Sequence, residues 1–173
     1  PVFFRNTFGH GDTNNDGFLR RDSVLAIIML TDEEDCSTRD PELFNPSSTL
    51  YTADLNLRCF AHAEAAVHPI ERYVDGFLQL RRFPSRLVFA PIAGVPVDLV
   101  AGPGGPTRWA PLTSEDPAVR DDRMEERVDP AMPSRLIPSC NVPGRGVAFP
   151  PVRIVRVAER LERRGARVAV GSI

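Results

Sequence analysis

The sequence predicts an α/β fold with a partial parallel sheet, formed by a βαβαβ series. Three short segments rich in Val, Leu, Ile and Phe alternate along the chain with two segments that have the apolar spacing of amphipathic helices. Strands joined by such helices lie parallel in one sheet, because the crossovers are right-handed. With 173 residues, 42% of them hydrophobic, the chain has the size of a single domain.

The first half of the series comprises a strand, a helix and a second strand. The strand at 24–31 is an uninterrupted apolar run, which is typical of a strand buried on both faces. The helix at 69–82 opens with a proline and ends in two arginines. Its apolar face is formed by Ile70, Tyr73, Val74, Phe77 and Leu78. In the strand at 86–93, Pro91 has no N–H to donate, so we expect the pairing to fray there.

The second half adds an amphipathic helix at 152–164 and a strand at 166–170. Gly165 follows two arginines and marks the end of that helix. Two long excursions interrupt the series, a polar loop at 33–67 and a Pro/Gly-rich insertion at 94–149. Within the insertion, we expect a short polar helix at 116–128.

Charge and hydropathy exclude several classes of partner. The formal net charge of -2 gives no reason to expect nucleic acid or an anionic membrane surface. No apolar run approaches the roughly 18 residues of a membrane span. The chain begins with proline in place of methionine and stops within a predicted strand, so we expect it to be an excerpt of a longer protein.

Four acids, Asp32 to Asp35, follow the first strand directly. Open α/β folds bind ligands beyond the carboxyl ends of their strands, and carboxylates there are candidate ligands of a divalent cation, Mg2+ or Ca2+. We favour Asp32 over Glu33, Glu34 and Asp35 because it comes first after the apolar run. The alternative is that these acids are the solvated end of a buried strand.

A second acidic segment matches the opening of a calcium loop. Asp12, Asn14 and Asp16 place oxygen ligands at the first, third and fifth positions, and Gly17 stands at the sixth. The twelfth position is Ser23, where a bidentate acid belongs. The alternative is a turn of residues that tolerate unusual backbone angles.

The three cysteines, Cys36, Cys59 and Cys140, have irregular spacing and no CxxC pair. In a secreted protein, Cys36 and Cys59 would close a loop of about two dozen residues, worth about 3 kcal/mol. We favour this disulfide because the loop is polar and, on its sequence, lacks an apolar core of its own. Cys140 would then find its partner in sequence outside the excerpt. In a reducing compartment, all three would be ordinary thiols.

Leu30-Thr31-Asp32 and the order of elements after it resemble the second half of a von Willebrand factor type A domain, a Rossmann-like three-layer sandwich. Gly17-Phe-Leu-Arg20, the segment Thr31 to Cys36, and Pro138-Ser-Cys140 resemble secreted or surface-anchored type A-like proteins of myxobacteria and relatives. The resemblance implies an adhesion domain in which Asp32 lies beside the cation. Glu33 replaces the family's glycine, and the family's Asp-x-Ser-x-Ser motif is missing.

The sequence is compatible with three functions. The first is a non-enzymatic adhesion or protein-interaction domain, extracellular, periplasmic or anchored at the cell surface, that binds a protein or a cell-surface component through a divalent cation. The second is a metal-dependent hydrolase or phosphoesterase with strand-end carboxylates. The third is a structural calcium module at Asp12 to Asp16. We favour the first because the sequence has no visible nucleophile, HExxH motif or phosphate-binding loop.

Overall fold

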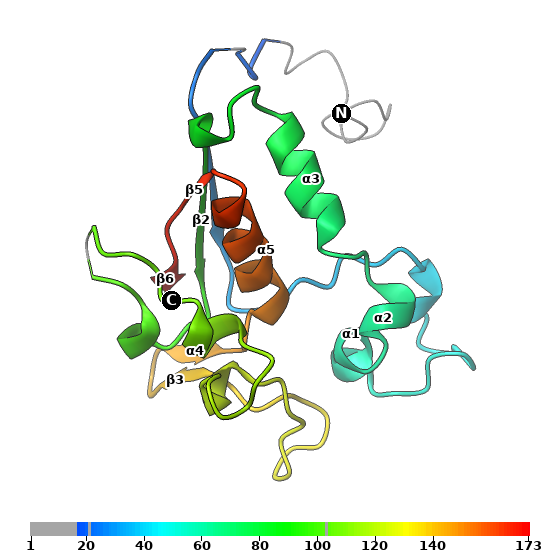
Figure 1. The fold of residues 1–173 in the computed structure, drawn as a ribbon. Helices are drawn as coiled ribbons and strands as arrows, with labels where there is room; N and C mark the ends of the chain where they lie inside the picture. The colour runs from blue at the N-terminus through cyan, green and yellow to red at the C-terminus, as the bar shows by residue number, and fades with distance from the viewer. Residues whose placement is uncertain (1–16, 21, 103) are drawn as a thin grey trace.

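A parallel sheet forms the centre of the computed structural model, which describes residues 17–20, 22–102 and 104–173 (Figure 1). Strand β2 (Leu87–Ala93) is central, with β1 (Leu25–Leu30) on one side and β5 (Arg167–Val168) and β6 (Gly171–Ser172) on the other. All pairings are parallel. This confirms the predicted direction of the three strand segments and the mixed α/β class.

The effect of Pro91 is confined to one side of β2. The ladder to β1 is continuous from Leu25 opposite Leu87 to Leu30 opposite Ile92, so it passes Pro91 without a break. On the other side, the carbonyl of Phe89 accepts from Ala169 and that of Ala93 accepts from Ile173. Pro91 lies between those two positions and has no N–H, and there the third strand is divided into β5 and β6.

Two helices, α3 (Glu71–Gln79) and α5 (Val152–Arg163), pack on the same face of the sheet. Consecutive right-handed crossovers that advance in one direction across a sheet place their helices on one side. The core between them and the sheet contains Val74, Leu87, Phe89, Ile154, Val157, Ala158 and Leu161. Helix α5 ends at Arg163, and Gly165 follows the helix end as predicted, with a φ of 89° that suits glycine.

The expectation that β1 is buried on both faces is wrong. Leu25, Ile27 and Met29 pack against the core, whereas the alternate residues Ala26, Ile28 and Leu30 are exposed in the described structure. Since both helices lie on the core side, no described helix covers these alternate residues. The apolar run therefore leaves an open apolar face.

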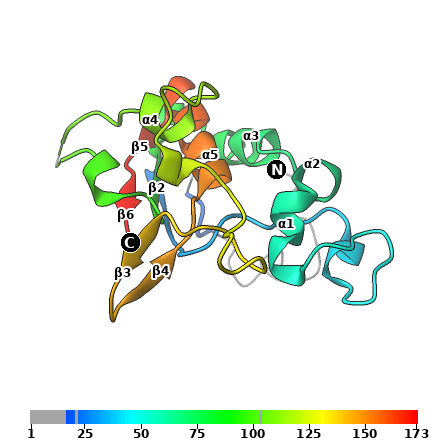
Figure 2. The same cartoon turned by 90° about the horizontal axis from the view of Figure 1, so that it is seen from below.

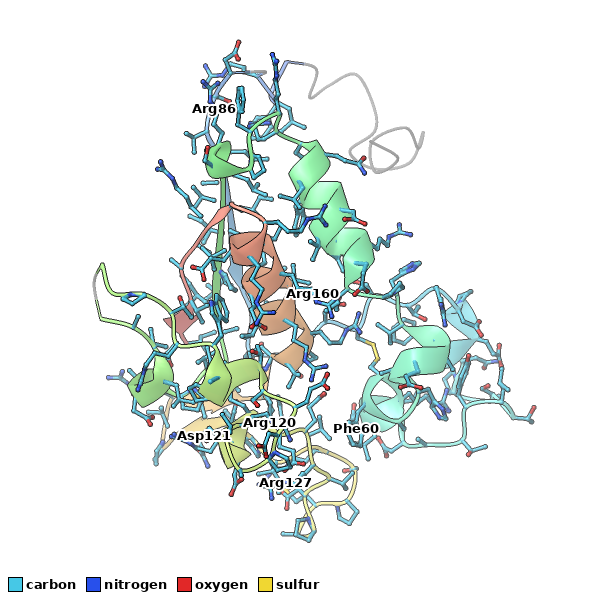
Figure 3. The ribbon with its side chains drawn as sticks, viewed as in Figure 1. Phe60, Arg86, Arg120, Asp121, Arg127 and Arg160 are labelled. Atoms are coloured by element: carbon cyan, nitrogen blue, oxygen red, sulfur yellow. A yellow bond between two sulfur atoms is a disulfide. The ribbon has the colours of Figure 1, made fainter. Side chains whose placement is uncertain are left out.

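The excursion after β1 folds into a small lobe with helices α1 (Arg58–Ala61) and α2 (Ala63–Ala66). The expectation that this loop lacks its own apolar core is wrong, because Leu43, Tyr51, Ala66 and Val67 are buried together. The predicted disulfide between Cys36 and Cys59 is present beside this core, and Figure 3 shows it as the yellow bond. It ties α1 to the chain that leaves β1.

The insertion 94–149 contains helix α4 (Ala110–Thr113) and a hairpin of β3 (Cys140–Val142) and β4 (Gly146–Ala148). The predicted polar helix at 116–128 is absent; only a 3₁₀ turn forms there. Asp116 and Asp121 bond nearby backbone N–H groups, which competes with helix formation. The 3₁₀ turns of the described residues are Pro41–Phe44, Leu55–Leu57, Pro84–Arg86, Val97–Leu99 and Asp122–Met124.

Trp109 anchors the insertion to the body of the protein. Its ring contacts the sheet core and a second cluster that includes Leu112, Met124 and Val155. Its Nε1 donates to Glu162 of α5 at 2.5 Å. Within the described residues, none of the helices has the length and apolar character needed to span a membrane.

Candidate binding site at the carboxyl edge of the sheet

The carboxyl ends of the strands meet the β3–β4 hairpin at one edge of the sheet (Figure 2). Beyond β1, the N–H of Thr31 donates to the carbonyl of Ile92 at 3.1 Å. The next carbonyl, that of Asp32, accepts from the N–H of Phe149 at 2.8 Å, directly after β4. Asp32 is therefore held at the point where the sheet edge joins the hairpin.

Gly94 lets the end of β2 lie close to the backbone of Phe149. A Cβ atom there would clash with the backbone carbonyl oxygen of Phe149. The hydroxyl of Ser139 completes the junction: its one proton is shared between the carbonyls of Gly94, at 2.5 Å, and Ala148, at 3.1 Å. Because Ser139 is buried, these bonds join the start of the hairpin firmly to the end of β2.

A cleft of about 230 Å3 lies between the sheet edge and the hairpin. Its charged groups are Asp32 and Arg145. Exposed apolar side chains, Val142, Val147 and Ile173, form much of the remaining wall. The complete lining is Asp32, Cys140, Val142, Arg145, Gly146, Val147, Ala148 and Ile173. The cleft thus offers both charges and an apolar surface to a ligand.

The Asp32 side chain is exposed, and its carboxylate has no hydrogen bond or ion pair to the described residues. The chain is turned at this point by Thr31, whose hydroxyl accepts from the N–H of Glu33 at 3.1 Å. The structure therefore places the predicted site residue at the carboxyl edge and on the cleft. It leaves the carboxylate available to a cation or to a partner's donor.

Glu34 caps helix α5. Its carboxyl oxygens accept from the backbone N–H groups of Arg153, at 2.5 Å, and Ile154, at 3.4 Å. Burial raises the pKa of Glu34 from 4.5 to about 8, against the opposing effect of these hydrogen bonds. A nearby acid, Glu126, adds to the rise. Glu34 therefore has a structural role at the first turn of α5.

The remaining two acids differ from Glu34 and from each other. Asp35 forms an ion pair with Arg153 at 3.1 Å and accepts from the hydroxyl of Ser37 at 2.6 Å. Glu33 is exposed, and its pKa is raised by partial burial and by the negative charge of Asp32. Of the four consecutive acids, Asp32 and Glu33 are therefore the two whose carboxylates have no bonded partner in the described structure.

These residues do not form a complete metal site. Mg2+ and Ca2+ take six or more oxygen ligands, several of them from the protein in a dedicated site. The described part of the chain contains no group of three or more His, Cys, Asp or Glu side chains placed to hold a metal ion. Asp32 fits the role of one ligand only. The candidate calcium ligands Asp12, Asn14 and Asp16 lie outside the described residues.

Sequence reasoning missed the hairpin side of the cleft. Pro143-Gly144 between two short apolar segments is a recognisable turn signal, and Gly144 has a φ of 76°. That signal predicts the hairpin but not its docking beside Asp32. Cys140, a free thiol on the cleft wall, has its pKa raised by burial, which favours the unreactive protonated form.

The fold and the cleft define an α/β protein with a parallel sheet, a disulfide-linked lobe and a small cleft at the carboxyl edge. Comparison with protein-family models, with curated proteins and with solved structures found no match.

Proposed function

We propose that this chain is a non-enzymatic adhesion or protein-interaction domain that binds a protein partner in the cleft at the carboxyl edge of the sheet. The observation that carries the proposal is the Asp32 carboxylate, which is exposed on the cleft without a bonded partner among the described residues. A divalent cation, Mg2+ or Ca2+, is part of the proposal as a bridge between Asp32 and a partner's carboxylate.

Two further features support binding of a polypeptide. Asp32 and Arg145 present opposite charges in one cleft, which suits a segment with both charged and apolar side chains. Val142, Val147 and Ile173 are apolar yet exposed there, and a partner would remove them from water. The disulfide between Cys36 and Cys59 fits an oxidising location, which we propose to be extracellular, periplasmic or at the cell surface.

A peptide-display selection tests this function. The protein, with Mg2+ and Ca2+ present, would be used to select peptides from a random phage-displayed library. We expect selected peptides to lose binding to Asp32→Asn and Arg145→Glu. Matched controls, Asp54→Asn and Arg127→Glu, change the same charges away from the cleft, and Figure 3 labels Arg127. The two control variants should bind the selected peptides as tightly as the unmodified protein does.

The possible results distinguish two claims: that the cleft is the binding surface, and that a cation bridges Asp32 to the partner. Peptides that bind all four variants equally would contradict the cleft as the binding surface, as would the absence of any enriched peptide. A chelator added after binding tests the cation independently. If the peptides stay bound when the chelator is added, the cation bridge is rejected while the cleft is retained.

A further inference from the structure

The face of the sheet opposite the two long helices is apolar and open in the described structure. Val24, Ile28 and Leu30 are 59%, 70% and 68% exposed. Ile28 and Leu30 lie beside Ala90 and Ile92 of β2 in the sheet register. Val88, opposite Ala26, lies on this face too, and the three β2 residues are half-buried there. Parallel sheets are normally covered on both faces, and a contiguous apolar patch of this kind marks an interaction surface.

Charges of opposite sign stand at the two ends of this face. At the amino end, Arg167 of β5 is exposed beside Val88 in the sheet register, and Arg86 forms an ion pair with Asp22. Figure 3 shows Arg86 at the end of the sheet away from the hairpin. At the carboxyl end stand Asp32 and Glu33, and the structure pairs neither with a basic group within the described ranges. The open face is therefore positive at one end and negative at the other.

A second copy of the same chain matches both features. Two sheets can pack face to face, and a two-fold axis across the strands makes the strands of the two copies antiparallel. That arrangement places the arginine end of one copy over the acidic end of the other, twice. A parallel arrangement would bring like charges together. The apolar rows of both copies would be buried between the sheets.

We propose that the open face is the interface of a homodimer, in which two copies of this chain pack sheet against sheet with antiparallel strands. Ile28 lies near the middle of β1 and therefore close to the two-fold axis. Arg86 of one copy lies over Glu33 of the other, so the dimer leaves the Asp32 carboxylate to the cleft. The dimer depends on the open face and not on a ligand in the cleft, so the peptide selection and the dimer test fail independently.

Sedimentation equilibrium of the full chain tests the dimer. We expect the unmodified protein to dimerise, and Ile28→Lys and Val88→Lys to raise the dimer dissociation constant by more than about tenfold. The matched control is Val97→Lys, because Val97 is 76% exposed but lies outside the sheet. Circular dichroism would verify that each variant is folded.

Several results would overturn the proposal. One is an unmodified protein that remains monomeric up to its solubility limit. Another is an Ile28→Lys variant that dimerises like the control. If Val88→Lys dimerises normally while Ile28→Lys does not, the contact is the free edge of β1 and not the face.

A charge exchange tests the antiparallel arrangement. Glu33→Arg and Arg86→Glu should each weaken the dimer, and the double variant should recover most of the affinity. Failure of the double variant to recover would contradict the antiparallel arrangement.

Discussion

Four consecutive acids follow β1, and the structure gives them different roles. Asp32 and Glu33 are exposed, Glu34 caps α5, and Asp35 pairs with Arg153. The sequence was sufficient to place Asp32 at the carboxyl edge, because its position directly after an apolar run is a local property. It was insufficient for Glu34, because its partner in α5 is 119 residues away.

Glu34 makes stability depend on pH. Its pKa is raised from 4.5 to about 8 in the folded chain, so the folded state keeps a proton that the unfolded state has lost. The resulting stability is fully present below pH 4.5 and is lost as the pH rises to about 8. Within that window, we expect the contribution of Glu34 to fall by up to about 1.4 kcal/mol per pH unit.

The variant Glu34→Gln should remove this dependence, because glutamine stays neutral and keeps an oxygen acceptor for the N–H groups of α5. Urea unfolding of both proteins at several pH values measures it. Parallel pH profiles for the variant and the unmodified protein would contradict the raised pKa.

Gly94 should be essential for the junction between the sheet and the hairpin. We expect Gly94→Ala to cost about 2 kcal/mol of unfolding free energy, because the added methyl group meets the carbonyl oxygen of Phe149. Gly102→Ala is the matched control, since its Cβ would meet no atom within 4 Å. Denaturant unfolding compares the two, and equal stabilities would show that the junction relaxes freely.

At the scale of elements, the periodicity of apolar residues predicted the regular helices and strands. It did not predict features that depend on contacts between distant parts of the chain. Apolar spacing predicted the helices α3 and α5 and the strands β1 and β2. The division of the third strand into β5 and β6 follows from Pro91, but only once β2 is known to be central. The missing helix at 116–128 reflects aspartates that bond their own backbone.

The lobe at 36–67 combines a small core with the Cys36–Cys59 disulfide. We expect the double variant Cys36→Ser/Cys59→Ser to lose about 3 kcal/mol of stability, because the unfolded loop regains its freedom. Hydrogen exchange should show the loss concentrated in the lobe, with the sheet still protected. Cys140→Ser is the control. Non-reducing peptide mapping of the unmodified protein should recover the Cys36–Cys59 link, and free thiols at both positions would contradict it.

At the scale of the whole molecule, the parallel arrangement was predictable because crossover handedness is general. The burial of β1 on both faces was predicted wrongly for a related reason. A continuous apolar run shows that both faces are apolar, but not that the described chain covers both. Both helices lie on one side because the strands advance in one direction, from β1 through β2 to β5.

The most direct test of the account is an NMR titration of the unmodified protein and Asp32→Asn with Ca2+ and Mg2+. We predict that the amide signals of Asp32, Glu33 and Ile173 shift with a midpoint of about 1 mM, because only one ligand is supplied by the described residues. The shifts should vanish in Asp32→Asn. An absence of shifts at the cleft, or equal shifts in the variant, would contradict a cation site at Asp32.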